Sequence, residues 1–153
     1  LIESGQRVRA ARRLRGEPYF TLLDELVEAI AEVFPHTLVQ WEDFRKDNAL
    51  AILDRYSDVL PSFNDDIQGT GGVVMAGLNS ALKIKGERLA DQRIIVFGAG
   101  AAGLGVTRQI RTQLSERGLS AMEQSAIVAV LDRSGLIVAD GSAIDAYKSE
   151  LAW

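Results

Sequence analysis

Arg93-Ile94-Ile95-Val96-Phe97-Gly98-Ala99-Gly100-Ala101-Ala102-Gly103 is the stretch of this 153-residue chain that decides its fold. Its continuous apolar run is typical of a strand buried in a parallel sheet, so we expect a strand over residues 93–97. The glycines follow that strand and open a helix predicted over residues 101–114. The alternation from strand to helix indicates an α/β protein.

The spacing of the three glycines predicts a dinucleotide site. Gly98 allows a sharp turn, Gly100 lets the backbone approach a pyrophosphate, and Gly103 lets helix and strand pack closely. The N-terminus of the helix would then face the phosphates. The alternative is a tight strand–helix turn without a ligand.

A second buried strand is predicted over residues 127–132, and it ends on Asp132. An acid there would accept hydrogen bonds from the adenosine ribose; an extra turn and short helix over residues 115–125 would explain why it lies further from the glycines than the usual spacing of about 20 residues. Its charge would repel a 2′-phosphate, so NAD is expected, with NADP as the alternative because Arg133 and Lys148 offset that repulsion. The expected cofactor contacts in this unit are Gly98, Gly100, Ala101, Ala102, Gly103, Asp132 and Arg133.

Upstream, residues 62–72 place Asp65 and Asp66 between two amide residues and before a glycine-rich run. A second acidic pair, Glu42-Asp43, ends a strand predicted over residues 37–41. Adjacent side chains diverge along a strand, so this pair can converge only where the strand turns. Carboxylate oxygens suit Mg²⁺ or Mn²⁺, and a buried cluster of them needs a cation, whereas solvated acidic pairs do not. The candidate metal ligands are Glu42, Asp43 and Asp66.

The remaining pattern predicts helices from about residue 17 to Pro35, over residues 44–56 and over residues 73–85. We expect two α/β domains. Residues 1–64 would be the C-terminal part of the first, with an arginine-rich loop or short helix over residues 1–16. Residues 65–153 would begin a Rossmann-type domain. A complete sheet of that type needs about six strands, so the parallel sheet is expected to be incomplete and the chain a piece of a longer protein.

Composition excludes several classes of protein. The chain is 47% hydrophobic and 25% charged, which is typical of a globular protein, and its net charge of −4 gives no basic surface for nucleic acid. It has neither an apolar run long enough for a membrane span nor a signal peptide, and we expect a cytoplasmic location. Without cysteine, any metal must be held by oxygen atoms or by His36.

These motifs resemble the malic enzyme family. The matching segments are Gln40-Trp41-Glu42-Asp43-Phe44, Asn48-Ala49, Phe63 to Thr70, and the glycine loop through Gly105. The resemblance implies that Glu42, Asp43 and Asp66 bind Mn²⁺ or Mg²⁺ and that the first domain binds malate and metal. It also implies that Asp65 supports the catalytic base and that Thr70 lies near the cofactor.

The family's activity is the oxidative decarboxylation of L-malate to pyruvate and CO₂ with reduction of NAD(P). Its catalytic lysine and tyrosine lie upstream of the matching segments and its later substrate-binding asparagines are missing here, so we expect the isolated segment to be inactive and the full-length enzyme to be a homo-oligomer. One alternative is a malolactic enzyme, which converts malate to lactate and CO₂. The other is a non-catalytic NAD-binding module.

Overall fold

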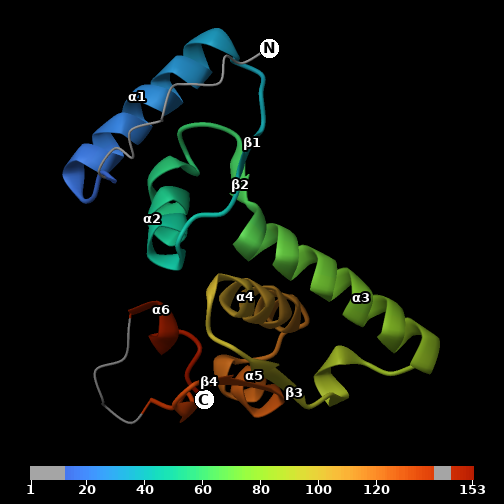
Figure 1. Ribbon diagram of the computed structural model, residues 1–153. Helices are drawn as coiled ribbons and strands as arrows, with labels where there is room; N and C mark the ends of the chain where they lie inside the picture. Colours follow the sequence, from blue (N-terminus) through green and yellow to red (C-terminus); the bar gives the residue numbers. More distant parts are fainter. Residues whose placement is uncertain (1–12, 140–145) are drawn as a thin grey trace, which may run out of the picture. The chain divides into compact units, whose positions relative to one another are not determined.

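The computed structural model describes residues 13–139 and 146–153, and it divides into two compact units, Leu1–Thr37 and Leu38–Trp153 (Figure 1). In the first unit, helix α1 (Glu17–Val33) has a proline in its first turn and ends before Pro35, as predicted. The expectation for residues 1–16 falls mostly outside the described residues. No helix in the described ranges is long and apolar enough to cross a membrane.

The second unit begins with two parallel strands, β1 (Val39–Trp41) and β2 (Ser62–Asn64), joined through helix α2 (Lys46–Tyr56). The register places Trp41 opposite Asn64. Tyr56 at the end of α2 stacks against Trp41, with ring centroids 6.0 Å apart. The sequence predicts β1 and α2, but it does not predict β2, which has only three residues.

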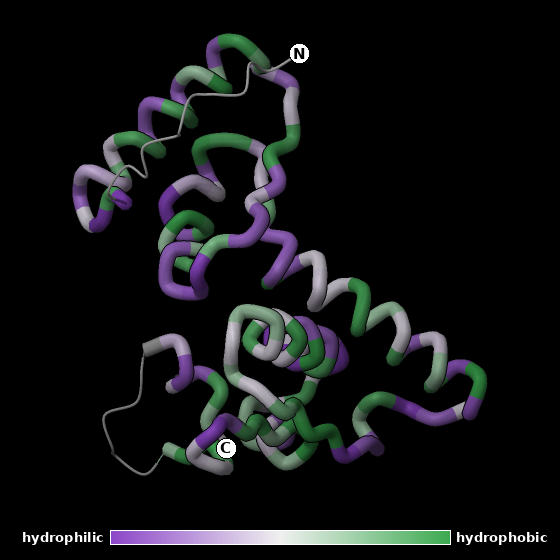
Figure 2. The backbone as a smooth tube through the Cα atoms, viewed as in Figure 1, coloured by the Kyte–Doolittle hydropathy of each residue, from purple (hydrophilic) through white to green (hydrophobic). Residues whose placement is uncertain are grey.

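A polar turn joins this strand pair to the next helix. Residues Asp65–Gly69 form a π-helical turn, η1, that continues directly into helix α3 (Thr70–Lys85) (Figure 1). The helix therefore begins three residues before the predicted start at residue 73. Figure 2 shows a largely hydrophilic turn where the chain leaves β2. At its far end, α3 is closed by Gly86 in the left-handed conformation, with φ of 69°.

The second sheet confirms the predicted α/β class. Strands β3 (Ile94–Phe97) and β4 (Val128–Asp132) are parallel neighbours, and the short β5 (Gly135–Leu136) adds an antiparallel edge. Helices α4 (Ala101–Glu116) and α5 (Ala121–Ile127) connect β3 to β4. A 3₁₀ turn, η2 (Leu89–Asp91), precedes β3, and helix α6 (Ala146–Ser149) follows β5. The sequence predicts the short α5 but neither β5 nor α6.

Apolar side chains of the second unit gather in two clusters, and α4 contributes residues to both. One contains Leu50, Ile67, Leu104 and Val130, and the other contains Met75, Ile110, Leu114 and Val128. Ile94 and Val96 of β3 pack against the second cluster. The other face of the strand is exposed to solvent, since Ile95 is 69% and Phe97 86% exposed. The prediction that β3 is buried on both faces is therefore wrong for the described residues.

Candidate functional site

The acidic pair Glu42-Asp43 lies where β1 ends. Asp43 is in the left-handed region, with φ of 58°, which aspartate tolerates better than most residues do. This turn is the change of direction that a converging pair requires. Glu42 accepts a hydrogen bond of 2.9 Å from the side-chain amide of Gln40, which orients its carboxylate.

Asp66 joins this pair from the η1 turn. One carboxylate oxygen each from Glu42, Asp43 and Asp66 lie within 4.8 Å of one another. The Asp66 Oδ2 atom also accepts the backbone N–H of Asp43 at 3.2 Å, which ties the two segments together. Glu42 and Asp43 are exposed and Asp66 is partly buried. A set of three carboxylates from two segments can hold a hard divalent cation.

Asp65 and Thr70 lie at the two ends of η1. The Asp65 side chain folds over Gly69, because a Cβ atom added to Gly69 would lie 2.3 Å from Asp65 Oδ1. Thr70 is the first residue of α3, and its backbone N–H donates to the carbonyls of Asp65 and Ile67. Both side chains are partly buried. The turn therefore leads from the acidic cluster into the helix that packs on α4.

The glycine loop has the geometry expected of a strand–helix crossing. Gly98 adopts φ of 126° and donates its N–H to the carbonyl of Leu131 on β4 at 2.7 Å. Gly100 is the N-cap of α4, and a Cβ atom built on it meets no described atom within 4 Å. A Cβ atom on Gly103 would lie 1.8 Å from the Gly98 carbonyl oxygen. The second glycine thus leaves room for a ligand, and the third permits close packing.

A close backbone approach joins the acidic turn to helix α4, two residues after the last glycine of the loop. A Cβ atom on Gly105, in the second turn of α4, would lie 1.8 Å from the carbonyl oxygen of Ile67. One on Gly71 would lie 2.8 Å from the Gly105 carbonyl oxygen. Glycine at both positions lets α3 and α4 meet without side chains between them. The elements that carry the predicted metal ligand Asp66 and the predicted cofactor glycines are therefore in contact within one unit.

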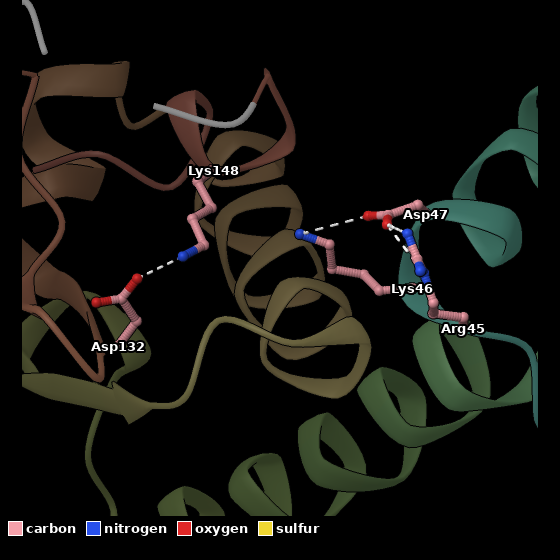
Figure 3. A network of polar contacts seen from close by, with 5 residues as sticks. All are labelled: Arg45, Lys46, Asp47, Asp132 and Lys148. Atoms are coloured by element: carbon pink, nitrogen blue, oxygen red, sulfur yellow. Dashed lines mark hydrogen bonds and ion pairs between the residues drawn. The ribbon is translucent and has the colours of Figure 1, made fainter. Parts of the chain in front are cut away.

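Asp132 ends β4 and is held by two donors. Its Oδ1 atom accepts the Ser134 N–H at 2.7 Å, and its Oδ2 atom accepts Lys148 Nζ at 2.5 Å (Figure 3). The hydrogen bond from Lys148 is the main reason that the pKa of Asp132 lies below its ordinary value, followed by the Ser134 N–H, while Arg133 adds a smaller attraction. The Asp132 side chain is only 16% exposed.

The segment that carries Lys148 is anchored on α4 by two arginines. Arg108 donates to the Glu150 carboxylate at 3.0 and 2.8 Å. Arg111 donates to the backbone carbonyls of Glu150, Leu151 and Ala152, and desolvation of its half-buried guanidinium lowers its pKa. The sequence does not predict this anchor, because contacts about 40 residues apart leave no local pattern.

Figure 3 also shows a second charged group, at the start of α2. Arg45 binds Asp47 at 2.6 Å, and Lys46 approaches the other oxygen of Asp47 at 4.0 Å. Lys46 matches no catalytic motif in the sequence. We assign this group no role in chemistry.

Together these features describe an α/β protein with a glycine loop of the dinucleotide-binding form and a carboxylate cluster on elements that contact the helix after that loop. Residues 67–152 match the family model described as "Malic enzyme, NAD binding domain", and residues 7–57 match "Malic enzyme, N-terminal domain". Since the first match alone covers more than half of the chain, this chain belongs to the malic enzyme family.

Named relatives agree with that membership. The chain is 42% identical over 134 residues to a malolactic enzyme of Leuconostoc mesenteroides, covering 88% of this chain and 25% of the relative. It is 44% identical over 128 residues to NAD-dependent malic enzyme 3 of Bacillus subtilis, covering 84% and 23%. The chain thus spans about a quarter of the length of these relatives.

Solved structures support the same fold. The NAD-dependent malic enzyme of Thermotoga maritima aligns with a TM-score of 0.65 at 24% identity, over 84% of this chain and 33% of the other. The malic enzyme of Entamoeba histolytica aligns with a TM-score of 0.64 at 26% identity, over 83% and 26%.

Proposed function

We propose that the protein carrying this chain is a metal-dependent, NAD-using malic enzyme that converts L-malate to pyruvate and CO₂. The observation that carries the proposal is the convergence of Glu42, Asp43 and Asp66 on a turn that contacts α4, directly behind the glycine loop. A site that removes hydride from malate and then CO₂ needs a cation and a nicotinamide side by side.

The acidic cluster fits a divalent cation by the chemistry of its donors. Three carboxylates with oxygen atoms within 4.8 Å repel one another, and Mn²⁺ or Mg²⁺ would relieve that repulsion. When bound, the cation would polarise the C2 oxygen of malate, and the nicotinamide would accept the hydride from C2. Asp65, at the start of the same turn, is assigned to support of the proton-transfer base. That base and the acid that completes the reaction are assigned to the remainder of the full-length protein.

The cofactor half of the proposal assigns the pyrophosphate to the open side of Gly100 and the first turn of α4, at Ala101 and Ala102. Thr70 would lie near the nicotinamide end. Asp132 would receive the ribose hydroxyls, since each of its oxygens has a second lone pair beyond those used by Ser134 and Lys148. We propose NAD as the cofactor, in keeping with the name of the NAD-dependent relative in Bacillus subtilis.

We place the domain boundary between residues 64 and 65, where β2 ends and η1 begins. The first domain would then supply Glu42 and Asp43, and the second Asp66 and the cofactor loop. We further propose that the full-length protein is a cytoplasmic homo-oligomer, and that residues 1–153 alone do not turn over malate.

A malolactic enzyme is the second candidate, because relatives with that name are 42% and 46% identical to the chain. Incubating the full-length protein with L-malate, NAD and Mn²⁺ separates the two. We expect equal amounts of pyruvate and NADH, the latter followed by absorbance; lactate without net NADH would establish the malolactic reaction instead. A non-catalytic module would bind NAD equally well with or without metal and malate.

Replacing Lys148 with methionine should increase selectivity for NAD over NADP. The substitution removes the cation that neutralises Asp132, so the bare carboxylate would repel a 2′-phosphate more strongly and the pKa of Asp132 would rise. Loss of one charge-assisted interaction should lower kcat/KM for NADP about tenfold relative to NAD. Lys83→Met, an exposed lysine at the end of α3, is the matched control and should leave the ratio unchanged. An unchanged ratio in Lys148→Met would show that Lys148 does not set selectivity.

A further inference from the structure

Asn64 and Gln68 hold the η1 turn by a reciprocal pair of hydrogen bonds. The Asn64 Oδ1 atom accepts the Ile67 N–H at 3.0 Å and so caps the start of the turn. In return, the Asn64 N–H donates to Gln68 Oε1 at 2.9 Å. The pattern resembles the capping box of an α-helix, in which two backbone donors are satisfied reciprocally. Asp65 and Asp66 are the two residues enclosed between Asn64 and Ile67.

The burial of Asn64 argues that this arrangement serves more than stability. Its side chain is completely buried, yet its Nδ2 atom has no hydrogen-bond partner among the described residues. A buried donor without an acceptor costs free energy, so an apolar residue of similar size would pack here at lower cost. An apolar residue, however, would lack the oxygen atom that accepts the Ile67 N–H and caps the turn.

The η1 turn has an uncommon backbone conformation that needs stabilising contacts. A π-helical turn is rare and occurs frequently at functional sites. On its other side it packs against Gly105 of α4 through the Ile67 carbonyl. The hydrogen bonds of Asn64 and Gln68 therefore fix the start of the turn, and the contact with α4 fixes it at Ile67. Between these two contacts, Asp66 meets Asp43 and Glu42.

We propose that Asn64 and Gln68 are positioning residues that fix the Asp65–Asp66 turn in the geometry that binds the divalent cation. This inference rests on the proposed function, and it adds two residues that need not touch the cation. Hydrogen-bond partners that orient metal ligands typically change metal affinity about 10- to 100-fold when they are removed.

Gln68 provides the test, because it is exposed and its replacement should leave the fold intact. In the full-length protein, Gln68→Met keeps the length of the side chain but removes the acceptor for the Asn64 N–H. We expect Mn²⁺ to bind about tenfold more weakly, measured by titration calorimetry without malate, with a broadened electron paramagnetic resonance spectrum of the bound ion. Gln68→Glu restores an acceptor and should restore both properties.

Gln92→Met is the matched control, since it makes the same substitution beyond the far end of α3, where the Gln92 amide donates to Glu87 and to the Arg88 carbonyl. It should bind Mn²⁺ as the wild type does. If wild type binds Mn²⁺ and Gln68→Met binds it equally well, the positioning role is refuted while the proposed function stands. Equal losses in the methionine and glutamate variants would refute it as well. A wild-type protein that fails to bind Mn²⁺ would overturn both proposals.

Discussion

Asp66→Ala in the full-length protein is expected to lower malate turnover about a thousandfold, which corresponds to roughly 4 kcal/mol of transition-state stabilisation from a bound cation. Asp66 is the ligand that the η1 turn contributes, and its Oδ2 atom also accepts the Asp43 N–H. Removing it leaves Glu42 and Asp43, which are adjacent and exposed. Mn²⁺-dependent reduction of NAD with L-malate is the measurement.

In Asp66→Ala, a loss of metal binding can be distinguished from a loss of folding. Removing one of three carboxylates relieves their mutual repulsion, and this gain offsets the loss of the hydrogen bond from the Asp43 N–H, so thermal unfolding of the metal-free protein should be almost unchanged. Mn²⁺ should then raise the melting temperature of wild type but not of Asp66→Ala. Asp58→Ala, at an exposed acid after α2, should behave as wild type in both assays. If Asp66→Ala retained full turnover, the metal assignment would be wrong.

Local patterns were sufficient to predict strands β3 and β4 and the helices that connect them. The apolar runs of β3 and β4 and the glycine spacing lie within short stretches of sequence, and the structure adds a Ser120 cap at the start of α5. Ser120 accepts the Glu123 N–H while Glu123 accepts the Ser120 N–H, a capping box that starts the short helix before β4. The Ser120 hydroxyl, which donates to the Glu123 carboxylate at 2.7 Å, and then the Ser120 N–H lower the pKa of Glu123.

The features that the sequence did not reveal depend on partners far along the chain. Strand β2 has three residues and exists because β1 pairs with it from more than 20 residues away. The exposed face of β3 is a similar case: Ile95 and Phe97 extend an apolar run, but the described helices leave that face uncovered. An apolar run predicts a strand but not which layers cover it.

The acidic site could be predicted in part from the sequence. Convergence of Glu42 and Asp43 at the end of a strand was expected, and the structure places Asp43 in a left-handed turn there. The amide residues beside the two aspartates were visible in the sequence, but their reciprocal bonds were not, because a π-helical turn has no local signature. The role of Gly105 was also hidden, since it depends on the approach of η1 to α4.

Gly105→Ala is expected to destabilise the protein by about 3 kcal/mol, at the upper end of the usual cost of overpacking. The new Cβ atom would lie 1.8 Å from the carbonyl oxygen of Ile67, and this neighbour is backbone that cannot rotate away. α4 must therefore move away from η1, which also disturbs the packing of Leu104 and Ile67 in one apolar cluster. Urea unfolding of the full-length protein measures the loss.

The same displacement should reach the acidic site. Ile67 directly follows Asp66, so a shift of its carbonyl changes the geometry of the carboxylate cluster, and Mn²⁺ affinity should fall together with stability. Gly77→Ala is the matched control within α3, where a Cβ atom meets no described atom within 4 Å. It should stabilise the helix by about 0.5–1 kcal/mol and leave Mn²⁺ binding unchanged. If Gly105→Ala were as stable as the wild type, α4 and η1 would not be in contact. The acidic cluster and the glycine loop would then not be held together through this glycine.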